Sequence, residues 1–197
     1  MIKTGIMGGT FDPIHNGHLL LARFAKEQHG LDEVWFMTSG NPPHKQNERT
    51  DAHIRHKMVC MAIEKDEDFI PCDFEVNRTE LSYSVHTMEH FAKKYPQREF
   101  YFIIGQDSLN GLPKWYEPKR LLELTKLLVY PRKRDGSLEC EINEITESYG
   151  GDIRQIDAPL FEISSTNIRK RAAKGQSIRH MTTDAVCEYI EESGLYK

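Results

Sequence analysis

The chain has 197 residues, of which 39% are hydrophobic, and this length suits one domain with one core. Its 26 Lys and Arg residues against 30 Asp and Glu residues give a formal net charge of −4, which argues against nucleic-acid binding. No apolar run reaches the ~18 residues of a membrane span, so no membrane partner is expected. The N-terminus meets glycine before a signal peptide could form, and the four cysteines form no CxxC pair, so a reducing, cytoplasmic location is expected.

Short apolar runs alternate with segments of helical periodicity along the chain. The runs predicted as strands cover residues 2–7, 33–39, 69–76, 99–105, 126–131 and 152–158. The segments predicted as helices cover residues 17–30, 54–63, 83–96, 118–125, 139–149, 164–175 and 183–194. Pro71 makes the third strand an edge or irregular strand, because proline has no N–H to donate to a neighbour.

Alternating strands and helices predict an α/β fold. We expect a doubly wound, mostly parallel, Rossmann-like sheet with a C-terminal helical addition from about residue 164. The whole chain, 1–197, is expected to form a single nucleotidyltransferase domain. Ligands of such sheets bind beyond the carboxyl ends of the strands, so the chemistry should lie just after residues 7, 39, 105 and 131.

The loop at residues 8–18, which reads GGTFDPIHNGH, is the most informative of these segments. Its glycines allow the backbone to approach a ligand, and the helix that begins near Gly17 offers free N–H groups to an anion. His15 and His18 can donate to phosphate oxygens and stabilise charge that develops on them. The loop is neither a Walker A loop nor a GxGxxG loop, so an ordinary P-loop enzyme or dinucleotide oxidoreductase is not indicated.

Two motifs of this chain resemble those of a known superfamily. Residues 8–18 resemble the HxGH motif of nucleotidyltransferases, and ISSTNIR at 163–169 resembles their second motif. Further segments are similar to bacterial nicotinate-nucleotide adenylyltransferases, and they are NPPHK at 41–45, LSYSVHT at 81–87, GQD at 105–107 and LPKW at 112–115. The resemblance extends along nearly the whole chain.

The resemblance implies transfer of AMP from ATP to nicotinate mononucleotide, giving nicotinate adenine dinucleotide and pyrophosphate in NAD biosynthesis. Mg²⁺ would be carried with ATP, and no metal site of the protein's own is expected. The acceptor phosphate is already charged, so it needs no strong base. The enzyme has to align two polyanions and stabilise the charge on the departing group.

The resemblance also implies roles for individual residues. His18 and His15 would be catalytic, with His18 as the main transition-state donor. The expected ATP-binding residues are Gly8, Gly9, Thr10, Phe11, His15, His18, Arg132, Ile163, Ser165, Thr166, Ile168 and Arg169. The expected acceptor-binding residues are His44, Lys45, Ser84, Thr87, Asp107 and Trp115. Ser84 stands where the family usually has Thr, which keeps the hydroxyl and removes a methyl group.

Other interpretations of the same residues stay open. A related adenylyltransferase would use nicotinamide mononucleotide or pantetheine phosphate, a sensor module would bind ATP without turnover, and a metal hydrolase would use the HxxH pair as ligands. His86 and His90, four residues apart, are expected to be exposed rather than metal-bound. A homo-oligomer is compatible with the sequence, which does not specify the number of subunits.

Overall fold

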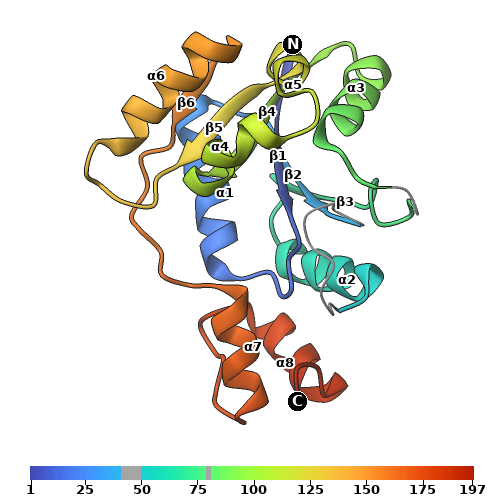
Figure 1. Ribbon diagram of the computed structural model, residues 1–197. Helices are drawn as coiled ribbons and strands as arrows, with labels where there is room; N and C mark the ends of the chain where they lie inside the picture. The colour runs from blue at the N-terminus through green and yellow to red at the C-terminus, as the bar shows by residue number, and fades with distance from the viewer. Residues whose placement is uncertain (41–49, 79–80) are drawn as a thin grey trace.

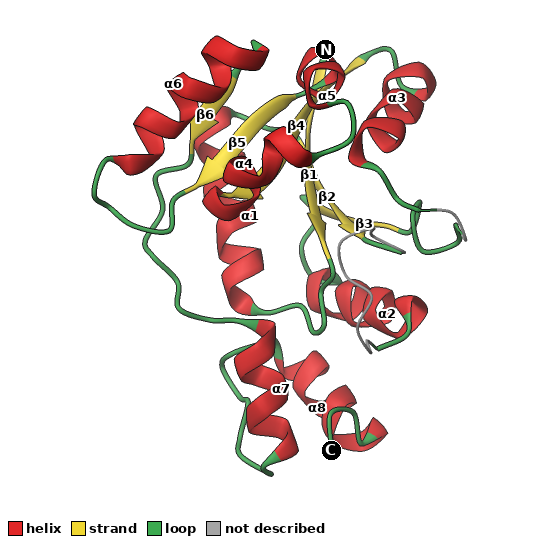
Figure 2. Ribbon diagram, in the orientation of Figure 1, coloured by secondary structure: helices red, strands yellow, loops and turns green. Residues whose placement is uncertain are grey.

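The computed structural model describes residues 1–40, 50–78 and 81–197 of the chain. Its sheet contains six parallel strands in the order β3-β2-β1-β4-β5-β6, with helices on both sides (Figures 1 and 2). The strands are β1 (Ile2–Gly9), β2 (Glu33–Thr38), β3 (Phe69–Cys72), β4 (Arg98–Gly105), β5 (Lys126–Tyr130) and β6 (Ile153–Gln155). The expected α/β, doubly wound, parallel architecture is confirmed.

The helices follow the strands in alternation. They are α1 (Asn16–His29), α2 (Ala52–Ile63), α3 (Ser84–Lys94), α4 (Gln106–Gly111), the 3₁₀ helix η1 (Leu112–Lys114), α5 (Pro118–Leu124), α6 (Ser137–Tyr149), α7 (Ser165–Ala173) and α8 (Asp184–Ser193). In the described part of the chain, no helix has the length and apolar character needed to cross a membrane.

Alternate residues of the strands face two separate core clusters. Met7 and Phe36 pack in the cluster that α1 and α2 cover, whereas Ile6, Trp35 and Phe102 pack in the cluster that α3, α5 and α6 cover. Since successive side chains of a strand point to opposite faces, a continuous apolar run is what a sheet covered on both faces requires. The strand predictions rested on such runs.

β3 is the edge strand that Pro71 predicts, although it is shorter than expected. Pro71 pairs with Phe36 of β2, the single neighbour of β3 in the sheet. The predicted strand 69–76 stops at Cys72, because the chain turns there and the N–H of Val76 bonds the carbonyl of Asp73 at 2.9 Å. This turn directs the following residues toward the carboxyl edge of the sheet.

The two C-terminal helices lie beyond the carboxyl edge of the sheet, and α8 packs beside α2 (Figure 1). Ile168 of α7 and Val186 and Ile190 of α8 are almost completely buried in the same cluster as residues of α1 and α2. The C-terminal helical addition therefore shares a core with the sheet, and it lies next to the turn that follows β1.

Candidate active site

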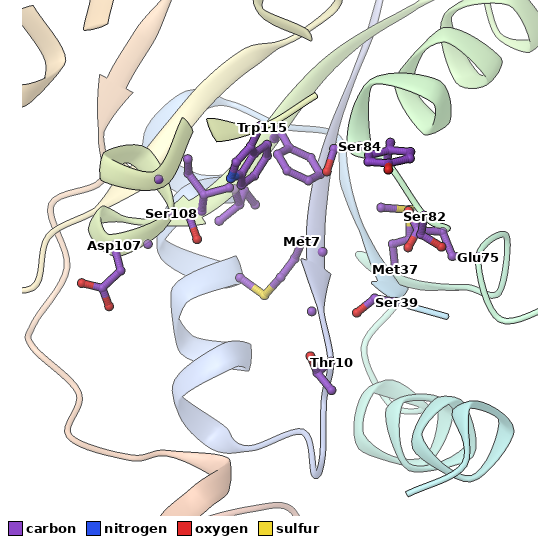
Figure 3. A pocket seen from close by; sticks show the side chains of 18 of the residues that line it. Met7, Thr10, Met37, Ser39, Glu75, Ser82, Ser84, Asp107, Ser108 and Trp115 are labelled. Atoms are coloured by element: carbon purple, nitrogen blue, oxygen red, sulfur yellow. The ribbon is translucent and has the colours of Figure 1, made fainter. Parts of the chain in front are cut away.

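A cavity of about 500 Å³ opens at the carboxyl ends of β1, β2 and β4. β1 and β4 are neighbours at the point where the strand order reverses, which is the usual ligand position in this architecture. Its wall contains these predicted site residues: Gly8, Gly9, Thr10, His18, Ser84, Asp107 and Trp115. In Figure 3, Trp115 and Ser108 face the cavity from one side and Ser82 and Ser84 from the other, above Met7 of β1.

His15 and His18 form a stacked pair at the start of α1. Their ring centroids lie 3.6 Å apart with 17° between the planes, and the backbone N–H of His15 donates to Nδ1 of His18 at 3.2 Å. Gly17 leaves room for this stack, since a Cβ there would lie 3.1 Å from Nδ1 of His15, a tight contact. The HNGH spacing thus places two imidazoles at one helix N-terminus.

Burial keeps both imidazoles neutral near pH 7. It lowers the pKa of His15 to about 4, and it lowers the pKa of His18 well below 6.5, with a further contribution from His15. Because Nδ1 of His18 accepts a hydrogen bond, the ring proton of the neutral form resides on Nε2. His18 lines the cavity, so this tautomer makes Nε2–H a neutral donor available to a ligand.

Phe11, in the loop between β1 and α1, packs against the His18 ring. Its ring meets that of His18 edge-on, with centroids 5.1 Å apart. The Phe11 backbone has φ of 50°, in the left-handed region that side chains other than glycine rarely adopt. A Cβ on Gly9 would lie 2.7 Å from the Phe11 ring, so Gly9 provides the space for this packing.

Residues of the C-terminal helices and the segments that follow them bind the loop that precedes α1. The Ser165 hydroxyl donates to the Pro13 carbonyl at 2.8 Å, and the Arg169 guanidinium donates to the Asp12 carbonyl at 2.7 Å. Further hydrogen bonds run from Thr182 Oγ1 to the Ile14 carbonyl (2.9 Å), from the Asn16 N–H to the Met181 carbonyl (2.9 Å) and from the Tyr196 hydroxyl to Asp12 Oδ1 (2.7 Å). These bonds fix the loop that carries His15.

Several residues predicted to bind ATP lie away from the wall of this cavity. Ile168 is fully buried in the core, Ile163 is partly buried against it, and Thr166 is exposed at the start of α7. Arg169 lines a second, more open cavity together with Asp12, Lys170 and Tyr196. The side chain of Ile168 therefore packs against protein, whereas Ser165 and Arg169 donate to backbone carbonyls of the loop before α1.

Two predicted residues that were assigned to different ligands form an ion pair. Arg132, expected near ATP, contacts Asp107, expected near the acceptor, with Nη2 and Oδ2 2.6 Å apart. Both side chains are more than 60% exposed. The backbone N–H of Arg132 also donates to the buried side chain of Gln106 at 2.7 Å, which holds the loop after β5 against α4.

The acceptor side of the cavity is built by η1 and α3. Trp115 follows η1 and meets Phe102 of β4 edge-on, with ring centroids 6.4 Å apart. Ser84 is the first residue of α3, whose N-cap residue Tyr83 makes no side-chain capping bond. His44 and Lys45 lie outside the described residues.

Glu75 is a site residue that the sequence did not indicate. It lines the cavity at 4% exposure, and burial raises the pKa of its carboxyl group. The Thr87 hydroxyl donates to Glu75 at 2.8 Å, so Thr87, itself buried, contacts the cavity through Glu75. Glu75 fell inside the predicted strand 69–76, and the turn after Cys72 is what brings it to the site.

The fold and the paired histidines at this edge define a nucleotide-transferring enzyme of the cytidylyltransferase-like family, whose model matches residues 6–171. Relatives that cover the full chain narrow this class. Proteins named probable nicotinate-nucleotide adenylyltransferase from Clostridium kluyveri and Caldicellulosiruptor bescii are 41% and 39% identical, with 100% of each chain covered. The chain belongs to the nicotinate-nucleotide adenylyltransferases, as its motifs predict.

A solved structure supports the fold independently. The Plasmodium falciparum nicotinic acid mononucleotide adenylyltransferase complexed with NaAD superimposes with a TM-score of 0.81, covering 100% of this chain and 98% of the other. At 21% sequence identity, this likeness confirms the fold and the course of the chain.

Proposed function

We propose that this enzyme transfers AMP from ATP to nicotinate mononucleotide and releases pyrophosphate and nicotinate adenine dinucleotide. The observation that carries the proposal is a neutral, buried His18 at the start of α1, in one cavity with Trp115 on the acceptor side. A hydrogen-bond donor for phosphate on one side of the cavity and an aromatic surface on the other suit a reaction between two nucleotides. Full-length relatives that are named for this activity support the same conclusion.

His18 donates from Nε2 to the phosphate oxygens of ATP, where negative charge grows as the bond to pyrophosphate breaks. An acceptor phosphate oxygen attacks the α-phosphorus, and the α–β bridging oxygen leaves with the pyrophosphate. The acceptor already carries its negative charge, so no residue has to remove a proton. A donor that is already positioned stabilises this change without reorganisation.

We call residues 8–15, which run from the end of β1 to the start of α1, the phosphate loop. This loop holds ATP through its backbone, together with the start of α1. Gly8, Gly9 and Thr10 line the cavity and bring their peptide groups near the nucleotide. His15 stacks on His18 and keeps its ring oriented toward the cavity. Ser165 and Thr166, at the start of α7, add the dipoles of their hydroxyl groups, and Arg169 of the same helix adds its positive charge.

Trp115 supplies a flat surface for the nicotinate ring, and the N-terminus of α3 lies across the cavity from it. The first turn of a helix has unpaired N–H groups, which favour an anion. The nicotinate carboxylate therefore binds near Ser84. Asp107 borders the same space, where its pair with Arg132 offers both an acceptor and a donor.

Mg²⁺ enters with ATP in this proposal. Within residues 1–40, 50–78 and 81–197, no three His, Cys, Asp or Glu side chains gather to hold a metal ion. Mg²⁺ usually takes many of its ligands from substrate phosphates and water, which is why we expect it to arrive bound to ATP. When bound, it neutralises part of the phosphate charge. Removal of Mg²⁺ with EDTA is expected to abolish turnover and excess Mg²⁺ to restore it.

We place the reaction in the cytoplasm, since Cys60, Cys72, Cys140 and Cys187, all in the described part, are free thiols. Light scattering of the purified protein measures the number of subunits.

A pyrophosphate-release assay with ATP and a panel of acceptors tests the function. The panel contains nicotinate mononucleotide, nicotinamide mononucleotide and pantetheine phosphate, each at the same concentration. Nicotinate mononucleotide is expected to give the highest kcat/KM. Preference for either other acceptor would assign a different branch of adenylyltransferases, and ATP binding without release from any acceptor would assign a sensor.

A further inference from the structure

Arg55 lies in the hydrophobic core, directly behind the phosphate loop. It begins the buried stripe of α2 that continues with Met58, Val59 and Ile63, and it is 2% exposed. An apolar side chain would suit this position, because a buried charge costs free energy unless polar groups surround it. The presence of Arg therefore needs an explanation from its contacts.

The guanidinium joins three chain segments at the carboxyl edge of the sheet. Nη1 donates to the carbonyl of Thr10 at 2.5 Å, Nη2 to that of Ser39 at 2.9 Å, and Nε to that of Thr50 at 2.9 Å. Thr10 follows β1 and Ser39 follows β2, and both residues line the cavity. One planar group thus bonds the two loops that leave the carboxyl ends of β1 and β2.

These bonds also orient the peptide groups of the loops. A trans peptide directs its C=O and its N–H to opposite sides. When the Thr10 carbonyl faces Arg55, the N–H of the next residue, Phe11, points away from α2. The loops are linked a second time by the Ser39 N–H, which donates to the Gly9 carbonyl at 2.9 Å. The charge of Arg55 lies behind a loop that is built to accept anions.

We propose that Arg55 is a positioning residue for nucleotide binding, which fixes the Thr10 and Ser39 backbone and places a buried positive charge behind the phosphate loop. The inference rests on the proposed function only in naming ATP as the anion. Arg55 itself stays out of contact with the reacting atoms. Its effect is expected mainly on ligand affinity, and stability alone does not describe its role.

Arg98 provides a matched control. It too is a largely buried arginine that joins β1 to β2, through Thr4 and Glu33, but it does so at the amino ends of these strands. Arg55→Met and Arg98→Met therefore remove the same group from opposite edges of one sheet. Arg55→Lys keeps the charge and part of the donation, and it serves as a second variant if Arg55→Met does not fold.

The experiment measures the Kd of a non-hydrolysable α,β-methylene ATP analogue by calorimetry, and hydrogen exchange at the Ser39 amide. Arg55→Met is expected to raise the Kd by about 10-fold or more and to accelerate exchange at Ser39. Arg55→Lys should lie between Arg55→Met and wild type. Arg98→Met should lower the Tm but leave the Kd within about twofold and Ser39 exchange unchanged.

Two results would overturn the inference. One is an Arg55→Met protein, or an Arg55→Lys protein if Arg55→Met does not fold, that binds the analogue like wild type with unchanged Ser39 exchange. The other is an Arg98→Met protein that loses affinity to the same extent. Failure of the proposed function gives a different result. In that case wild type binds the analogue but releases no pyrophosphate, and the comparison of Kd between wild type and the Arg55 variants still tests the inference.

Discussion

His18 depends on its immediate neighbours for both its charge state and its tautomer. Burial removes the positive charge, and the N–H of His15 occupies Nδ1, so one donor atom faces the cavity. A charged imidazole would bind the ground state of ATP tightly as well. A neutral donor strengthens most as charge builds on the phosphate, and such differential binding is what accelerates a reaction.

Replacing His18 with Ala is expected to lower kcat by about 10²–10³-fold, the usual loss for one transition-state donor. Steady-state kinetics would measure the loss. The circular dichroism spectrum should stay native-like, because His18 lies in the first turn of α1, which begins at Asn16. His53→Ala, at an exposed position of α2, is the control and should keep full activity. A folded His18→Ala enzyme with near-normal kcat would refute the role.

The burial of His15 predicts a dependence of stability on pH. The folded pKa of about 4 lies below the ordinary value of 6.5, so between these values the unfolded chain binds more protons. The free energy of unfolding should therefore fall as the pH decreases from 6.5 to 4, by roughly 3 kcal/mol for this group. His15→Gln should make that fall shallower.

Urea unfolding at several pH values measures this effect. His53→Gln serves as the exposed control and should follow the wild-type profile. If His15→Gln and wild type lost stability in parallel between pH 6.5 and 4, the buried neutral imidazole would not be the cause.

At the scale of elements, the sequence predicts the strands, most of the helices and the helix starts that carry the site. Apolar runs and N-cap residues are local signals, and α3 begins at Ser84, one residue after the start of the predicted helix 83–96. The short helices α4 and η1 lacked such a signal, since their six and three residues give no periodicity. Trp115 directly follows η1, so these two short helices determine its position on the wall of the cavity.

Long-range contacts explain what the sequence did not reveal. Arg55 follows a polar segment in the sequence, yet it lies buried in the core, where the carbonyls of Thr10 and Ser39 accept its hydrogen bonds from 45 and 16 residues away. Ile168 reads as a residue facing adenine, yet it packs against α8 and the sheet. Glu75 reads as part of a strand. Each outcome depends on which segments meet in space, and local patterns do not contain that information.

The N-terminus of α3 predicts selectivity for the acid over the amide form of the acceptor. An amide would leave one backbone donor facing its NH₂ group unpaired, at about 1–3 kcal/mol, or roughly 5- to 150-fold in kcat/KM. Ser84→Ala should keep this preference, because the backbone supplies the donors. Trp115→Ala should weaken both acceptors by similar factors, because both rings present a similar face.

Competing kcat/KM measurements with nicotinate and nicotinamide mononucleotides test this prediction. Equal use of the two acceptors by wild type would contradict it, as would loss of the preference in Ser84→Ala alone.

At the scale of the whole molecule, the C-terminal helices share one core with the sheet, and we propose that residues 1–197 fold as one domain. Ile168 is fully buried between the two parts. Ile168→Ala is therefore expected to lower the free energy of unfolding by about 2–5 kcal/mol while unfolding remains a single transition. Calorimetry measures both quantities, and a separate low-temperature transition of the C-terminal part would contradict the one-domain proposal.

The hydrogen bond from the Tyr196 hydroxyl to Asp12 joins two residues that are 184 positions apart. It predicts that the C-terminal segment controls the geometry of the phosphate loop. Burial and the Asp12 carboxylate raise the pKa of Tyr196, so its hydroxyl stays protonated and donates throughout the working range. Asp12 is 6% exposed, so Tyr196→Phe leaves its carboxylate short of a donor, at about 1–3 kcal/mol.

The loop that ends at His15, next to His18 in the first turn of α1, should then become less ordered, and kcat should fall together with stability. Tyr149→Phe, on the partly buried side of α6 and away from the loop, is the matched control. Urea unfolding and pyrophosphate release on both variants provide the comparison. Tyr196→Phe with wild-type kcat would show that the loop keeps its geometry without this bond, whereas a loss of kcat confined to Tyr196→Phe would connect the C-terminal segment to catalysis.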